Sequence, residues 1–216
     1  MVFVCTSWLI ALLSGQLLRI KNANRIPLET LGLGVNAIGP AGAAALATAL
    51  GSCPSCPLKT LGLYRNKMGD EGAAALAEHL VAPNQIGLHS LFLGGNDIGD
   101  RGAQALAAGL KSNTKLGILS LEGGSIGDDG AVALGDALGQ GTSAITSLDI
   151  RSCLPTHRNC YHSHLSEEEA AGVVGKGEKG LTKAGIDALK RAVAVRDGAL
   201  KVTGDVVFGG GKNKKK

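Results

Sequence analysis

Cysteine and histidine side chains are the groups in this sequence that could bind a metal ion. One pair, Cys53 and Cys56, has the C-x-x-C spacing that zinc sites use. A second group consists of Cys153, His157, Cys160, His162 and His164. Its donor atoms suit zinc, but its spacing matches no standard zinc finger. Both groups also fit a simpler interpretation, as reduced cysteines and exposed loop residues, and we expect no bound metal.

A glycine-rich segment at residues 175–180, G-K-G-E-K-G, matches the pattern of dinucleotide-binding loops. That pattern is informative only between a strand and a helix of a βαβ unit. Here it follows a helix-like segment, so a flexible loop of glycine and lysine is favoured. No Ser/His/Asp arrangement recurs along the chain, and aromatic residues make up only 3% of it, which leaves little to line an apolar pocket. The sequence therefore predicts a protein that has no cofactor and is not an enzyme.

A repeated segment determines where these residues lie. Residues 28–36 read LETLGLGVN, and related segments begin at residues 58, 88, 116 and 145, at offsets of 30, 30, 28 and 29. Each of the first four is followed by a second half such as IGPAGAAALATAL at residues 38–50. Apolar residues alternate as in a strand in the first half and have helical spacing in the second. Self-similarity at this period predicts a solenoid of stacked strand-turn-helix units. Because strands are spaced by ~4.8 Å, the two cysteine groups, about three repeats apart, cannot share a metal ion.

The pattern L-x-x-L-x-L-x-x-N resembles the leucine-rich repeat. The second half, I-G-D-x-G-A-x-A-L-A-x-x-L, is similar to the ribonuclease-inhibitor-like subfamily, and the resemblance covers about residues 28–153. That subfamily includes the leucine-rich domains of nucleotide-binding innate-immunity receptors and the Ran GTPase-activating proteins. The resemblance implies an α/β fold, a right-handed βα superhelix in a horseshoe arc. Its parallel sheet would be concave and its helices convex, with about five repeats plus caps.

Leucines and asparagines have fixed places in the repeat. In the first repeat Leu28, Leu31 and Leu33 are expected to point into the core. Asn36 then turns the chain, and a buried Asn there can hydrogen-bond the backbone of neighbouring turns. The equivalent residues of the next repeats are Asn66, Asn96 and Gly124. Because glycine has no side chain to make these bonds, we expect the fourth turn to be the softest.

Acidic residues stand where the helices are predicted to begin. These residues are Asp70, Asp100 and Asp128. There they can cap the helix and interact favourably with its dipole. Glycines follow two residues later, at Gly72, Gly102 and Gly130. Glycine costs up to ~1 kcal/mol of helix propensity, so we infer that it is kept for close packing against the neighbouring repeat.

The repeat divides the chain into three parts. Residues 1–27 are expected to form an N-terminal capping helix and lead-in; a signal peptide is the alternative, but its basic n-region is missing. Residues 28–199 hold the repeats, with an insertion at about 155–180 that splits the fifth. Residues 200–216 are expected to supply a capping strand and a disordered lysine tail.

Strands stacked side by side leave one face of the sheet uncovered by helices, the concave face, where solenoids commonly bind partners. Most side chains expected on this face are small. The larger ones are the candidate partner-binding residues Tyr64, Arg65, Phe92, Glu122, Asp149 and Arg151. We therefore predict a protein-interaction module whose partner is another protein of unknown identity. Two alternatives follow from the resemblance: a GTPase-activating regulator resembling the Ran GTPase-activating proteins, or a fragment of a larger innate-immunity-type receptor.

Charge and cysteine content limit the partners and the compartment. The formal net charge is +4, and residues 212–216 alone hold four lysines, so the remainder is near neutral and predicts no specific nucleic-acid binding. Five cysteines are an odd number at low density, which fits a reducing compartment. The apolar run at residues 8–13 is too short to span a bilayer. We expect a monomeric, cytoplasmic protein; the lysine tail leaves a nuclear location open, and secretion is less favoured.

Overall fold

The computed structural model describes residues 28–51, 56–81, 87–140, 143–151, 181, 183–196 and 199–203. The strands are β1 (Thr30–Gly32), β2 (Thr60–Gly62), β3 (Ser90–Phe92), β4 (Ile118–Ser120), β5 (Ser147–Asp149) and β6 (Lys201–Thr203). The helices are α2 (Gly39–Gly51), α3 (Gly69–Leu76) with its π-helical continuation η1 (Ala77–Val81), α4 (Asp100–Leu110), α5 (Asp128–Gly139) and α7 (Lys183–Val195). Strand and helix therefore alternate along the described chain.

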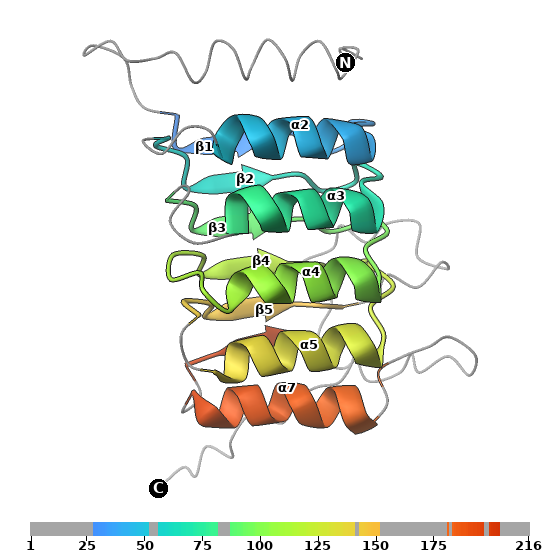
Figure 1. The fold of residues 1–216 in the computed structure, drawn as a ribbon, viewed down its shortest axis with the longest axis vertical. Helices are drawn as coiled ribbons and strands as arrows, with labels where there is room; N and C mark the ends of the chain where they lie inside the picture. The colour runs from blue at the N-terminus through green and yellow to red at the C-terminus, as the bar shows by residue number, and fades with distance from the viewer. Residues whose placement is uncertain are drawn as a thin grey trace, which may run out of the picture.

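The strands form one parallel sheet in the order β1-β2-β3-β4-β5-β6. Their register is uniform, since each central residue pairs with the central residue of the next strand, from Leu31 with Leu61 to Leu148 with Val202. Figure 1 shows the helices stacked in a second layer along the long axis, in front of the strands. This is the α/β leucine-rich repeat solenoid that the sequence predicts.

The core lies between the two layers. Leu58, Leu61 and Leu63 are fully buried, as are the equivalent leucines of the third and fourth repeats, and full burial of each stabilises the fold by about 1.5–3 kcal/mol. The first repeat differs, because Leu28 is 37% exposed and Leu31 is only partly buried. The prediction that Leu28 points into the core is therefore wrong. Among the described residues, β1 is the end of the sheet, so Leu28 has a neighbouring repeat on one side only.

Buried asparagines connect the turns of the first three repeats. The Asn66 Oδ1 atom accepts a hydrogen bond from the Asn36 N–H at 3.1 Å, and the Asn66 Nδ2 atom donates to the carbonyls of Leu33 and Leu63, both at 2.9 Å. Asn96 makes the same contacts one repeat further along. The predicted role of these side chains is confirmed. Each one satisfies backbone groups of its own turn and of the preceding turn.

The fourth turn is closed without an asparagine. A Cβ atom at Gly124 would lie 2.5 Å from the carbonyl oxygen of Ile98, so a side chain has no room there. The backbone makes the contact instead, because the Ser125 N–H donates to that carbonyl at 2.8 Å, beside an isolated parallel bridge between Gly99 and Ser125. Close backbone approach therefore explains Gly124, and the softness of this turn stays a prediction.

The acidic residues cap the next helix rather than their own. The Asp70 Oδ1 atom, in the first turn of α3, accepts hydrogen bonds from the N–H groups of Gly99 at 2.8 Å and Gly102 at 2.9 Å, at the start of α4. Asp100 makes the equivalent pair of contacts at the start of α5. The expectation of capping within one repeat is wrong, because these carboxylates point toward the following repeat. They therefore join successive repeats as well as satisfying helix ends.

The first-turn glycines make room for these carboxylates. A Cβ atom at Gly102 would lie 2.7 Å from the Asp70 Oδ1 atom and 3.1 Å from the Ala73 Cβ atom. Gly72 and Gly130 are approached as closely by the preceding repeat or by their own turn. The inference that glycine is kept here for close packing is confirmed.

The remaining parts of the expected organisation are only partly covered by the structure. The N-terminal cap at residues 1–27, the insertion at about 155–180 and the lysine tail lie outside the described residues. On either side of the insertion, β5 and α7 occupy the places expected for the split fifth repeat, and β6 pairs with β5 in the segment expected to end the stack.

Candidate functional site

The concave face is ordered into rows that run across the strands. A strand row contains the last residue of each strand, Gly32, Gly62, Phe92, Ser120 and Asp149. A turn row lies two residues further along each repeat and contains Gly34, Tyr64, Gly94, Glu122 and Arg151. Backbone hydrogen bonds hold neighbouring turns together, as where the Val35 N–H donates to the Tyr64 carbonyl at 2.8 Å. The sheet therefore fixes which side chains of successive repeats become neighbours.

Two exposed aromatic rings dominate the rows at the second and third repeats. Tyr64 is 37% exposed and Phe92 is 36% exposed. The Tyr64 ring lies over Gly34, because a Cβ atom at Gly34 would overlap it. Nothing lies within 4 Å of a Cβ atom at Gly32, and at Gly62 the nearest atoms belong to the backbone of the first repeat, 3.8 Å away. The two rings therefore lie near exposed backbone at Gly32 and Gly62, where no side chain covers the sheet.

Arg65 extends along the turns next to the aromatic rings. Its backbone has a φ of 54°, the left-handed region that residues other than Gly, Asn and Asp rarely adopt. A Cβ atom at Gly95 would lie 2.9 Å from the Arg65 Cγ atom, so the Arg65 stem lies along the neighbouring turn. Arg65 therefore borders the two rows rather than belonging to them.

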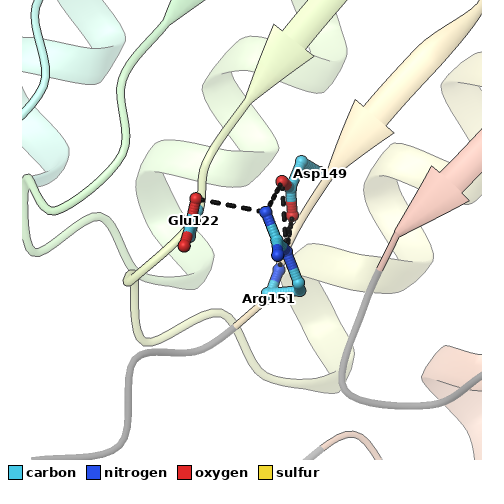
Figure 2. A network of polar contacts seen from close by, with 3 residues as sticks. All are labelled: Glu122, Asp149 and Arg151. Atoms are coloured by element: carbon cyan, nitrogen blue, oxygen red, sulfur yellow. Dashed lines mark hydrogen bonds and ion pairs between the residues drawn. The ribbon is translucent and has the colours of Figure 1, made fainter. Parts of the chain in front are cut away.

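Glu122, Asp149 and Arg151 form a charged group in the fourth and fifth repeats. Figure 2 shows Arg151 between the two carboxylates. The Arg151 Nη2 atom lies 2.6 Å from Asp149 Oδ2 and 3.3 Å from Glu122 Oε2, and the Arg151 Nε atom donates to Asp149 Oδ1 at 3.0 Å. Arg151 therefore binds Asp149 closely and Glu122 more loosely.

The negative charge of Glu122 is balanced less closely by Arg151 than that of Asp149 is. Burial raises its pKa above the ordinary value, the Arg151 guanidinium acts in the opposite direction, and the Asp149 charge raises it further. The Glu122 side chain is nevertheless 31% exposed. Its Oε1 atom makes no hydrogen bond to any residue in the described ranges. One oxygen of Glu122 is therefore left for solvent or for a group beyond the described residues.

The structure separates the six candidate residues into two groups. Tyr64, Phe92 and the adjoining Arg65 lie toward the first repeats, and the charged group lies toward the last. The side chain of Arg151, predicted as a partner-binding residue, is 41% exposed, and its guanidinium is paired with Asp149 and Glu122. Sequence reasoning missed Gly34 as the seat of the Tyr64 ring. The signal was available, because a glycine stands one repeat before a tyrosine at the same position.

The metal and nucleotide motifs fall almost wholly outside the described residues. Cys53, the group from Cys153 to His164 and the glycine segment at residues 175–180 are outside them, and Cys56 packs partly buried against the core. Within the described ranges, no group of three or more His, Cys, Asp or Glu side chains is placed to hold a metal ion. In the same ranges, no helix has both the length and the apolar character needed to cross a membrane.

The stacked repeats, with one sheet face that no described helix covers, define a leucine-rich repeat solenoid, a class of fold whose open face commonly serves as a binding scaffold. A family model described as Leucine Rich repeat matches residues 55–77, 88–107 and 112–135. Among solved structures, the chain is similar to leiomodin-1 actin-binding site 2, with 16% sequence identity and a TM-score of 0.50 over 78% of this chain and 83% of that one. At this identity the similarity shows the fold alone. No curated protein sequence matches the chain, and the ribonuclease-inhibitor-like subfamily is not confirmed.

Proposed function

We propose that the chain is a protein-interaction module that binds a partner protein through Tyr64 and Phe92 on its concave face. The observation that carries this proposal is the exposure of both rings, each more than a third accessible, on a face whose other side chains are mostly small. Aromatic residues are enriched among those that contribute most to binding energy at interfaces, and each ring offers a large apolar surface to bury.

The seat of the Tyr64 ring supports the same proposal. Because Gly34 lets the ring lie directly on the backbone of the first repeat, the ring has a fixed place before any partner arrives. Ordering of side chains at an interface costs about 0.5–1.5 kcal/mol for each flexible side chain, and a ring that is already ordered avoids part of that cost. Because Gly32 and Gly62 carry no side chains, a partner can also come close to the sheet beside this ring.

The experiment compares capture of partner proteins from a cell lysate by the full chain and by the Y64A/F92A double variant. We expect the proteins enriched by the unchanged chain to be reduced at least ~10-fold by the double variant, because two interface aromatics are removed. A matched control, R101A/Q104A, changes two exposed residues of α4 in the helix layer and should retain them. Purified partner must then bind directly; equal capture by all three proteins would refute the concave-face proposal.

The finer alternatives rest on the resemblance of the repeats. A GTPase-activating regulator would accelerate GTP hydrolysis by a purified GTPase of the Ran class, and stimulation that the Y64A/F92A variant retains would favour it over simple binding. A fragment of a larger receptor would bind its partner in the same way, with the nucleotide-binding domain elsewhere in a longer protein. A monomeric state and a cytoplasmic location are part of the leading proposal, and sedimentation and microscopy of the tagged full chain test them.

A further inference from the structure

A gap separates the aromatic and the charged groups of the concave face. In the turn row, Gly94 stands between Tyr64 and Glu122 and contributes no side chain. Tyr64 leans away from this gap, over Gly34. On the other side, a Cβ atom at Gly94 would lie 3.6 Å from the Glu122 Cβ atom, so Glu122 borders the gap directly. Phe92, two residues before Gly94, borders it from the strand row.

The charges at this gap are unbalanced. Two carboxylates, Glu122 and Asp149, share the single guanidinium of Arg151, which leaves the group with one net negative charge. Arg151 is closer to Asp149, at 2.6 Å, than to Glu122, at 3.3 Å. The Glu122 Oε1 atom has no partner in the described part of the chain. The Glu122 edge of the gap therefore offers a carboxylate oxygen to a positive group from beyond the described residues.

We propose that the gap over Gly94 receives an arginine side chain of the partner protein, which pairs with the Glu122 carboxylate and packs against the Phe92 ring. Arginine combines the two properties that this place requires, because its planar guanidinium binds carboxylates and stacks on aromatic faces. The inference rests on the proposed function and adds the chemistry of the partner.

Two other cations lie on the same face and do not occupy this place. The Arg65 stem lies along the turn at Gly95, and Lys201 pairs through the backbone with Ser147 at the far end of the sheet. Neither forms an ion pair with Glu122. The negative charge of the Glu122 group is therefore balanced by Arg151 alone within the described residues.

The test selects a phage-displayed library of random peptides on the unchanged full chain. We expect the selected peptides to share an arginine next to apolar residues. Replacing that arginine by glutamine should weaken binding at least ~10-fold, as expected for a charge-assisted hydrogen bond, and replacing it by lysine should weaken binding less. E122Q should cause a similar loss, and the two changes together should lose little more than either alone.

The controls separate this inference from the proposed function. D129N removes one carboxylate from an exposed position on α5 and should leave peptide affinity unchanged. Peptides that lose binding in Y64A/F92A but keep it in E122Q would overturn the arginine site and leave the proposed function standing. Peptides that bind Y64A/F92A and E122Q as tightly as the unchanged chain would overturn both the arginine site and the proposed function. A selected consensus rich in acidic residues would overturn the arginine site. Thermal unfolding of each variant shows that it is folded.

Discussion

The first three repeats and the last two build the concave face differently. In the first three, the Tyr64 ring lies over Gly34, Phe92 is exposed on the same face, and buried asparagines connect the turns. In the fourth and fifth, charged side chains pair with one another, and the turn at Gly124 is closed by backbone alone. The same repeat pattern therefore carries two kinds of surface. In the first three repeats an aromatic ring rests on glycine backbone, and in the last two repeats charged side chains hold one another through ion pairs. A partner bound at this face would therefore contact an apolar and a charged surface, with Gly94 at their border.

Removing the asparagine of the second turn should have the largest effect. Asn66 is fully buried and makes hydrogen bonds to its own repeat and to the first. Asn66→Ala leaves several buried backbone groups without partners, each costing about 1–3 kcal/mol before any relaxation. We expect the free energy of unfolding in urea to fall by about 2–4 kcal/mol. A loss below ~1 kcal/mol would show that water replaces the side chain.

Placing an asparagine in the fourth turn tests whether this turn differs from the turns that asparagines close. Because a Cβ atom at Gly124 would lie 2.5 Å from a carbonyl oxygen, Gly124→Asn should destabilise the chain by about 1–3 kcal/mol instead of extending the row of asparagines. A rise in the midpoint of urea unfolding would contradict this account. Hydrogen exchange of the unchanged chain should also be faster at the fourth turn than at the third.

Removing the aspartate hydrogen bonds between repeats should lower the free energy of unfolding by a smaller amount. Asp70 holds the start of α4 through two backbone N–H groups, so Asp70→Ala should cost about 1 kcal/mol, as loss of a helix cap does. Asp129, an exposed acidic residue of α5, serves as the matched control, because Asp129→Ala removes a carboxylate that makes no such contact. Equal unfolding midpoints for the two variants would argue against capping between repeats.

Displacing the Tyr64 ring from Gly34 should weaken partner binding more than it lowers the stability of the fold. Gly34→Ala pushes the far end of a side chain that can swing aside, so we expect a stability loss under ~1 kcal/mol and a loss of partner affinity of about 10-fold. Gly87→Ala places its methyl group in open space before β3, away from the two rows, and serves as the control. The comparison fails if both variants bind equally well.

The smallest effect concerns the pH dependence of stability. The pKa of Glu122 is raised in the folded chain above its ordinary value of 4.5, chiefly by burial. The folded state therefore holds this proton more tightly, and the resulting stabilisation is complete below the unfolded pKa and is lost as the pH rises through the folded pKa. The glutamine of E122Q does not titrate. Its stability relative to the unchanged chain should rise as the pH increases above about 4.5 in urea titrations; a falling difference would contradict the assignment.

Much of this architecture is predictable from spacing, because leucines at fixed offsets specify which face each residue takes. The same register predicts that Tyr64 and Phe92 share the concave face. Spacing does not predict which neighbour a polar side chain chooses. Asp70 reaches forward to α4, and Arg151 turns back onto Asp149, because these choices depend on distances between repeats that the pattern leaves open. The exposure of Leu28 likewise follows from its place at the end of the described sheet.

Site-specific crosslinking shows which layer of the solenoid contacts a bound partner. A photoreactive benzoyl-phenylalanine at position 92 keeps an aromatic ring where Phe92 stands, and the same group at position 104 lies on the exposed side of α4. With the purified partner bound, we predict a crosslink from position 92 and none from position 104. A crosslink from position 104 without one from position 92 would place the partner on the helix layer and contradict the account.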